Sequence, residues 1–195
     1  MSPKLSFGEP ADTLFLSDLE NATNYLEFGA GSSTLNAVSI APDVVSVESD
    51  REFLQAIQRR TLGSAACTHL LHVDIGPTGP WGVPILTSRF WRQAQRWEHY
   101  PQAPWEQVSP DYRADLVLVD GRFRVACALT VILLQSDSNW KLLIDDYADR
   151  PEYSVLERFA CLDVIRGRMA VFRPKIGIDL KEVAAARDAF IKDWR

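Results

Sequence analysis

The chain has 195 residues, with 21 basic and 26 acidic side chains and a formal net charge of −5. Its length favours a single domain that spans residues 1–195. It has no run of about 18 apolar residues, so we expect no transmembrane helix and no membrane partner. The acidic balance disfavours nucleic acid, whose binding proteins usually carry a basic surface.

The first ten residues lack the basic stretch and apolar run of a secretory signal, so we expect a cytoplasmic protein. The cysteines are odd in number and none form a C-x-x-C pair. Each lies in an apolar stretch, which predicts buried, reduced thiols. They are Cys67, Cys127 and Cys161.

Short β-type runs alternate with helical patterns along most of the chain, as is typical of parallel βαβ units. The expected strands are residues 24–28, 44–47, 68–73, 115–119 and 140–144, and the expected helices are residues 13–19, 33–40, 51–62, 124–135, 152–160 and 179–193. Two short runs, 162–165 and 169–172, flank Arg166-Gly167-Arg168 and predict a closing hairpin with an antiparallel strand.

Residues 76–113 interrupt this alternation and contain four of the six tryptophans and six prolines. We expect one short helix within them, at residues 88–99. So long an irregular segment is usually functional or partly structured. Two interpretations stay open, and both can hold: a lid over a small-molecule acceptor, or tryptophans that pack the insert onto the sheet or form a dimer surface.

A glycine turn follows the first expected strand. In an open parallel sheet, ligands bind beyond the carboxyl ends of the strands, and Gly29 and Gly31 stand at such an end. Glycine lets a ligand approach the backbone closely, and the helix that follows directs free N–H groups at it. Glu48 ends the second strand, where a carboxylate can accept hydrogen bonds from ribose hydroxyls.

Residues 26–32 read Leu-Glu-Phe-Gly-Ala-Gly-Ser and resemble the first motif of class I S-adenosylmethionine-dependent methyltransferases, an acidic-x-G-x-G pattern. Residues 44–50 resemble the second motif, Val73-Asp74 the third and residues 116–120 the fourth. The closing hairpin matches the antiparallel seventh strand of that family. The resemblance implies a doubly wound, Rossmann-like α/β fold with strand order 3-2-1-4-5-7-6 and helices on both faces.

The resemblance also implies S-adenosylmethionine as the cofactor and a set of residues to hold it. In the family, an acidic residue such as Glu27 helps position the methionine end, Glu48 binds the ribose, and Asp74 lies near the adenine amino group. The whole expected set is Glu27, Gly29, Ala30, Gly31, Ser32, Ser33, Thr34, Glu48, Ser49, Asp74 and Asp120.

Methyl transfer is an in-line displacement in which the cofactor supplies the electrophile, so the protein mainly aligns the acceptor and removes a proton. The candidate catalytic residues are Asp120, Asp145, Asp146 and His99. His99 is the candidate general base within the irregular segment, with a packed or exposed structural histidine as the alternative.

Three of these carboxylates also raise the question of a divalent metal. Asp120, Asp145 and Asp146 resemble the ligands of catechol-type metal-dependent O-methyltransferases, which use an Asp after strand four and an Asp-Asn pair after strand five. Asp146 departs from that Asn, and Asp120 is followed by Gly121-Arg122. The alternative is that Asp120 caps the next helix or contacts the cofactor, while Asp145 and Asp146 are solvated or form salt bridges with Arg122, Arg124 or Arg150. A divalent metal is therefore left open but not favoured, and we name no metal ligand.

We expect a methyltransferase acting on a small or medium acceptor. Residues 144–147 read Ile-Asp-Asp-Tyr and lack the Asn-Pro-Pro-Tyr type motif of amino-directed nucleic-acid enzymes. The first alternative is a non-catalytic S-adenosylmethionine-binding protein of the same fold. The second is an NAD(P)-binding oxidoreductase, disfavoured by Thr34 in place of a third glycine and by the closing hairpin. A homodimer is left open.

Overall fold

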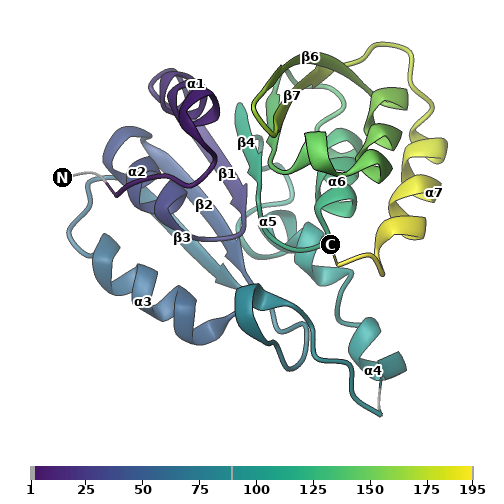
Figure 1. The fold of residues 1–195 in the computed structure, drawn as a ribbon, viewed down its shortest axis with the longest axis horizontal. Helices are drawn as coiled ribbons and strands as arrows, with labels where there is room; N and C mark the ends of the chain where they lie inside the picture. The colour runs from purple at the N-terminus through teal and green to yellow at the C-terminus, as the bar shows by residue number, and fades with distance from the viewer. Residues whose placement is uncertain (1–2, 89, 195) are drawn as a thin grey trace.

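The computed structural model describes residues 3–88 and 90–194, and its centre is a seven-stranded sheet (Figure 1). The strands are β1 (Asn24–Phe28), β2 (Asp43–Glu48), β3 (Cys67–His72), β4 (Leu116–Val119), β5 (Lys141–Ile144), β6 (Ala160–Arg166) and β7 (Met169–Pro174). Their order is β3-β2-β1-β4-β5-β7-β6. β1 to β5 pair in parallel, whereas β7 runs antiparallel to both β5 and β6. The predicted fold class and strand order are therefore confirmed.

Helices cover both faces of this sheet (Figure 1). One face carries α1 (Glu9–Leu19), α2 (Ser32–Ile40) and α3 (Arg51–Thr61), and the other carries α5 (His99–Gln107), α6 (Arg124–Leu134) and α7 (Leu180–Phe190). β4 shows how the two layers divide the core. Leu116 and Leu118 pack on the side of α1 and α2, while Val117 and Val119 pack on the side of α5 and α6. None of the helices in the described residues is long and apolar enough to cross a bilayer.

Several expected elements differ in the structure. α1 contains the expected residues 13–19 and extends back to Glu9, with Pro10 in its first turn, where a missing N–H costs nothing. Residues 152–160 do not form the expected α-helix. They fold as a 3₁₀ helix, η3 (Pro151–Arg158), and Ala160 already begins β6. A shorter 3₁₀ turn, η2 (Tyr147–Asp149), precedes it.

The insert between β3 and β4 is more ordered than the sequence indicated. The helix expected over residues 88–99 is instead the short α4 (Phe90–Ala94), and a separate helix, α5, follows it. Two insert tryptophans are buried and anchored by their ring N–H groups: Trp97 Nε1 donates to the Ile75 carbonyl at 2.9 Å, and Trp105 Nε1 to the Tyr112 carbonyl at 3.0 Å. The second half of the insert is thus part of the core.

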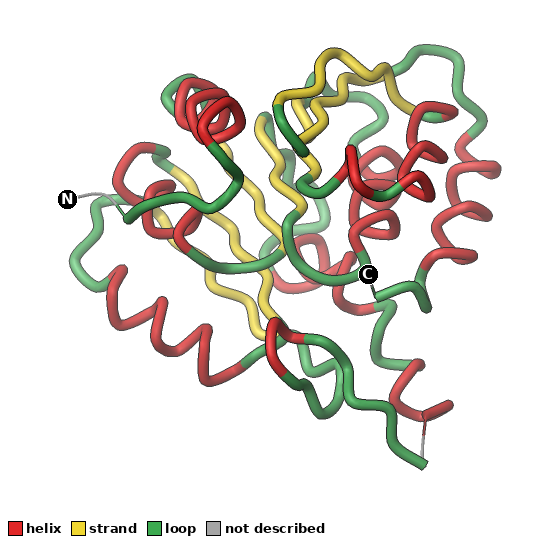
Figure 2. The backbone as a smooth tube through the Cα atoms, in the orientation of Figure 1, coloured by secondary structure: helices red, strands yellow, loops and turns green. Residues whose placement is uncertain are grey.

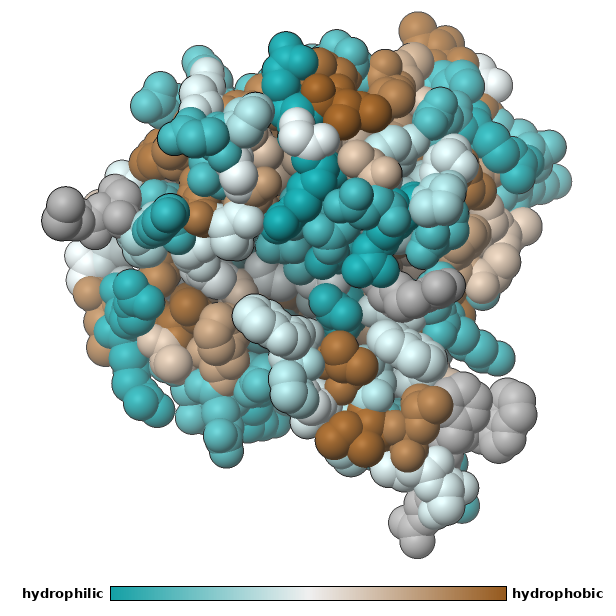
Figure 3. All heavy atoms as spheres, in the orientation of Figure 1, coloured by the Kyte–Doolittle hydropathy of each residue, from teal (hydrophilic) through white to brown (hydrophobic). Residues whose placement is uncertain are grey.

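The first half of the insert stays at the surface. Residues 76–88 run mainly as loop, with a single 3₁₀ turn, η1 (Pro80–Gly82) (Figure 2). Exposed apolar side chains gather along this stretch, at the lower edge of the face in Figure 3. They are Trp81, Val83, Ile85 and Leu86.

The expectation of three buried cysteines is wrong for two of them. Cys127 is buried in α6, but Cys67 and Cys161 are exposed. Cys67 lies on β3 and Cys161 on β6, the two edge strands of the sheet. An apolar run on an edge strand has neighbours on one side only, so some of its side chains meet solvent.

Candidate functional site

A cavity of about 600 Å³ opens at the carboxyl edge of the parallel strands. It is bounded by the turn after β1, the ends of β2, β4 and β5, the segment before α1 and the η1 turn. The lining residues are Ser6, Phe7, Gly29, Ala30, Gly31, Ser32, Ser33, Glu48, Ser49, Asp50, Phe53, Trp81, Gly82, Tyr100, Asp120, Gly121, Arg122, Arg124, Asp145, Asp146, Arg150 and Arg168. Eight of the eleven residues expected to hold the cofactor are among them.

The two glycines of the turn have different surroundings. Gly29 has φ +101°, and a Cβ on it would lie 2.6 Å from the Gly121 Cα, so this glycine lets two backbone loops cross. Gly31 has an extended φ of 177°, and a Cβ there would meet nothing within 4 Å. Gly31 therefore borders open space in the cavity, at the N-terminus of α2.

Glu27 and Thr34 lie beneath the turn rather than in the cavity, and both are fully buried. The Glu27 carboxylate accepts hydrogen bonds from the hydroxyls of Tyr25 (2.8 Å), Ser46 (2.7 Å) and Thr34. The Thr34 hydroxyl also accepts the Gly31 N–H at 2.8 Å. Burial raises the pKa of Glu27. The acidic residue of the first motif thus secures the turn from below.

Glu48 lines the cavity with a carboxylate that is held in place by backbone donors. Its Oε1 accepts from the Ser49 N–H at 2.6 Å and the Asp50 N–H at 2.8 Å, and its Oε2 accepts from the Ala30 N–H at 3.2 Å. These bonds fix the side chain across the mouth of the glycine turn. Burial raises the pKa of Glu48, although the backbone donors oppose that shift.

Asp120 follows β4 and stands between the glycine turn and α6. Its backbone N–H donates to the Phe28 carbonyl at 2.9 Å, and its carboxylate lies 3.2 Å from Arg124. Burial raises the pKa of Asp120 to about 7, with Arg124 opposing the shift and Asp145 adding to it. A carboxylate with such a pKa can both accept and release a proton near neutral pH.

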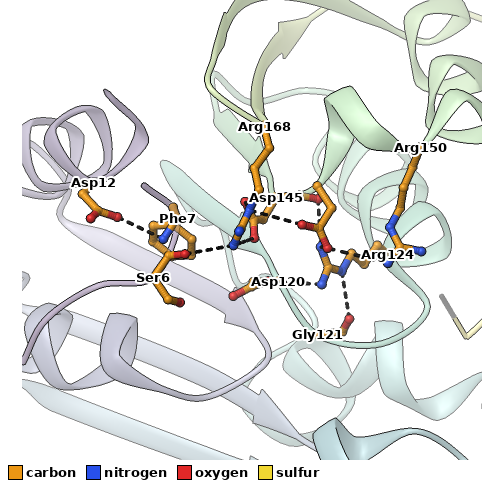
Figure 4. A network of polar contacts seen from close by, with 10 residues as sticks. Ser6, Phe7, Asp12, Asp120, Gly121, Arg124, Asp145, Arg150 and Arg168 are labelled. Carbon is orange, nitrogen blue, oxygen red and sulfur yellow. Dashed lines mark hydrogen bonds and ion pairs between the residues drawn. The ribbon is translucent and has the colours of Figure 1, made fainter. Parts of the chain in front are cut away.

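Asp145 and Asp146, the other two candidate carboxylates, are bound by arginines. Figure 4 shows Asp145 beside Arg168. Asp145 is 1% exposed and forms a bidentate pair with Arg168, at 2.7 and 2.8 Å. Asp146 lies 3.0 Å from Arg124, 3.2 Å from Arg168 and 3.6 Å from Arg150. Both carboxylates are therefore largely neutralised by fixed guanidinium groups.

This arrangement does not fit a divalent cation. Three of the carboxylate oxygens of Asp145 and Asp146 already face guanidinium nitrogens, and the fourth oxygen, Asp146 Oδ2, contacts two arginines. A cation bound there would lie against several positive charges. The geometry agrees with the salt-bridge alternative, although Arg168 is a partner that the sequence did not indicate.

Besides Glu27 and Thr34, two more expected site residues, His99 and Asp74, lie outside the cavity. His99 is at the surface, where its Nδ1 is 3.3 Å from Glu106. Asp74 is exposed and pairs with Arg96 at 2.6 Å. The structure therefore does not bring either of them to Asp120. For His99, the exposed-histidine alternative agrees with its observed position.

Conversely, the cavity contains residues that sequence patterns did not single out. Arg168 comes from the hairpin, and its guanidinium also donates to the Ser6 carbonyl at 3.0 Å, so it ties the N-terminal segment to β5 and β7 (Figure 4). Phe7, Phe53 and Trp81 add aromatic surface. No local signal marks them, because each reaches the cavity only through the folded chain.

The sheet order, the antiparallel β7 and the glycine turn at the carboxyl edge define the class I methyltransferase fold. Comparison with solved structures agrees. A methyltransferase-like protein from Silicibacter pomeroyi DSS-3 is 31% identical to this chain, with a TM-score of 0.84 and 98% of each chain covered. The chain therefore belongs to the methyltransferase-like proteins with the class I Rossmann-like fold. No protein-family model and no curated protein sequence matches it.

Proposed function

We propose that this protein is an S-adenosylmethionine-dependent methyltransferase that acts on a small or medium acceptor. The observation that carries the proposal is that one cavity joins the glycine turn and Glu48 to Asp120. The first two form an adenosine-type site, and the third is a carboxylate suited to proton transfer. The related Silicibacter protein is itself described as methyltransferase-like.

The residues at the turn end of the cavity suit the cofactor. Glu48 supplies carboxylate oxygens for ribose hydroxyls, and Gly31 leaves its backbone accessible at the α2 N-terminus, where helix N–H groups are available. When bound, the cofactor supplies an electrophilic methyl group. The protein itself has to place the acceptor and deal with its proton.

We assign to Asp120 the role of the general base that removes a proton from the acceptor. It lies at the end of β4 beside the turn, and its pKa of about 7 leaves a large fraction ionised at neutral pH. Arg124 holds the carboxylate in place and stabilises its ionised form. Asp145 and Asp146 are positioning residues in this scheme, since they orient Arg124 and Arg168.

The η1 turn is the part of the insert that we propose as a lid. Trp81 lines the cavity yet is 90% exposed, so its ring has room to close over a ligand. Trp97 and Trp105, by contrast, are core residues. The two interpretations of the insert thus apply to different halves of it.

Calorimetry with S-adenosylhomocysteine tests the cofactor half of the proposal. We expect saturable one-to-one binding to the wild-type chain. Glu48→Gln should weaken it about 10- to 150-fold, since a hydrogen bond to a charged group contributes about 1.5–3 kcal/mol. Glu52→Gln, at an exposed position in α3, is the matched control and should bind as the wild type does. Tighter binding of NAD than of S-adenosylhomocysteine would instead support the oxidoreductase.

Transfer of a labelled methyl group to fractionated small metabolites tests the catalytic half. We expect Asp120→Asn to lower kcat about 10²–10⁴-fold while leaving S-adenosylhomocysteine affinity nearly unchanged, because general-base catalysis contributes about that much. Binding of S-adenosylhomocysteine without transfer to any fraction would favour the non-catalytic binding protein. Unchanged turnover in Asp120→Asn would remove this residue from the mechanism.

A further inference from the structure

One arginine of the cavity differs from its neighbours in having no counter-ion. Arg124, Arg150 and Arg168 all pair with Asp120, Asp145 or Asp146. The guanidinium of Arg122 has no ion pair or hydrogen bond with any residue that the structure describes, and its Nε is buried.

The loop that carries Arg122 is rigidly held. Gly121 packs so closely over the Tyr100 hydroxyl that any Cβ there would collide with it, and the Arg122 carbonyl accepts the Cys127 thiol at 3.4 Å. The aliphatic part of Arg122 lies under the η1 turn, with its Cγ 3.9 Å from where a Gly82 Cβ would stand. The side chain is thus built into the cavity wall, two residues after Asp120.

Four arginines and five carboxylates line the cavity, but the carboxylates are bound by groups other than Arg122. Glu48 and Asp50 accept hydrogen bonds from backbone N–H groups. The other three carboxylates form their ion pairs with Arg124, Arg150 and Arg168. Burial and the adjacent Arg124 lower the pKa of Arg122, so its environment disfavours the charged form that an arginine nevertheless keeps.

A partly buried, uncompensated guanidinium is costly for the fold and is usually paired or used for binding. Its planar donors match the two oxygens of a carboxylate or phosphate. We propose that Arg122 binds an anionic oxygen group, carboxylate or phosphate, on the methyl acceptor. This inference rests on the proposed function. It narrows the acceptor to an acidic small molecule whose anionic group lies near the atom that Asp120 deprotonates.

The test uses the full chain saturated with S-adenosylhomocysteine, titrated with sodium phosphate or sodium acetate at constant ionic strength with chloride. Calorimetry and the shift in Tm report binding. We expect saturable anion binding to the wild type and an affinity at least tenfold lower in Arg122→Gln. Arg92→Gln, an exposed arginine of α4, is the matched control and should behave as the wild type. Whether phosphate or acetate binds more tightly distinguishes the two anion classes.

A second readout does not depend on how well the variant folds. In the wild type, the Nε–H resonance of Arg122 should shift on phosphate addition, while that of Arg92 should not. Equal anion affinity in wild type and Arg122→Gln, or an unmoved resonance, overturns the proposal. Loss of S-adenosylhomocysteine affinity in Arg122→Gln with unchanged anion binding overturns it too, by assigning Arg122 to the cofactor. Failure of the proposed function can be distinguished from failure of the anion-binding proposal. If the proposed function fails, the wild type does not bind S-adenosylhomocysteine even before any anion is added.

Discussion

Gly29 and Gly31 occupy the same turn, two positions apart, yet only the surroundings of Gly29 require glycine for the fold. At Gly29 the positive φ and the nearby Gly121 backbone leave no room for a side chain. At Gly31 the backbone is extended and the space beside it is open cavity. Glycine in this motif therefore serves loop packing at Gly29 and borders the open cavity at Gly31.

This contrast makes a prediction for two alanine substitutions. Gly29→Ala should cost about 1–3 kcal/mol of unfolding free energy, because a residue in a strained φ region must also displace neighbouring backbone. Gly31→Ala should change stability by less than about 0.5 kcal/mol but weaken S-adenosylhomocysteine binding about tenfold, because the new methyl group enters the site. Urea unfolding and calorimetry on both variants measure this. A stable Gly29→Ala, or a Gly31→Ala that binds normally, would contradict it.

Short motifs leave the orientation of side chains open. The acidic residue of the glycine motif, Glu27, faces Tyr25, Ser46 and Thr34 inside the fold. A short motif shows that a residue type belongs at a position. It does not show which way the side chain turns, since that depends on partners from other strands.

At the scale of elements, the insert between β3 and β4 combines a core helix with a surface loop. α5 packs against α6 and β2, and its residue Tyr100 supports the loop after β4. The η1 turn borders the cavity and exposes Trp81, whose φ of +62° is unusual for a residue with a large side chain. A strained conformation beside a ligand cavity agrees with a role for this turn in binding.

Two tryptophan substitutions should distinguish the role of the core part of the insert from that of the surface turn η1. Trp97→Ala removes a fully buried ring and should cost about 3–5 kcal/mol of stability. Trp81→Ala should leave stability within about 0.5 kcal/mol of the wild type but lower the affinity for S-adenosylhomocysteine or the acceptor. Thermal unfolding and calorimetry give both quantities. If Trp81→Ala binds both ligands as the wild type does, the lid proposal fails.

At the scale of the whole molecule, the site places several carboxylates where burial opposes their charge. Burial raises the pKa of Glu27, Glu48 and Asp120 above their ordinary values. A carboxyl group of this kind binds a proton more readily in the folded than in the unfolded chain. The protonated group therefore stabilises the folded state. Its full contribution to the unfolding free energy is present below the ordinary carboxyl pKa near 4, and this contribution is lost as the pH rises to the pKa of the folded state.

For Asp120 this window runs from its ordinary pKa of 3.8 to about 7. We expect the unfolding free energy of the wild type, relative to that of Asp120→Asn, to fall as the pH rises from 4 to 7, by up to about 1.4 kcal/mol per pH unit. The difference should level off above pH 7. Urea unfolding at several pH values measures it, with Asp111→Asn at an exposed site as control. A difference that stays constant, or that rises with pH, would show that the pKa of Asp120 is not raised.

The sequence by itself determined the alternation of strands and helices, the closing hairpin, the glycine turn and the place of Glu48 at the end of the second strand. These features depend on local periodicity and on residues that are neighbours in the chain. The strand order was implied by the resemblance of the motifs, in their order and spacing, to the methyltransferase family. Only the tertiary structure decided that Asp145 pairs with Arg168, 23 residues away, and that Arg168 reaches Ser6, 162 residues away. It likewise turned Glu27 inward, left His99 at the surface and gave Arg122 no ion pair with any of the described residues. The physical reason is that charge pairing and burial depend on distances in space, and those distances exist only once the elements are packed.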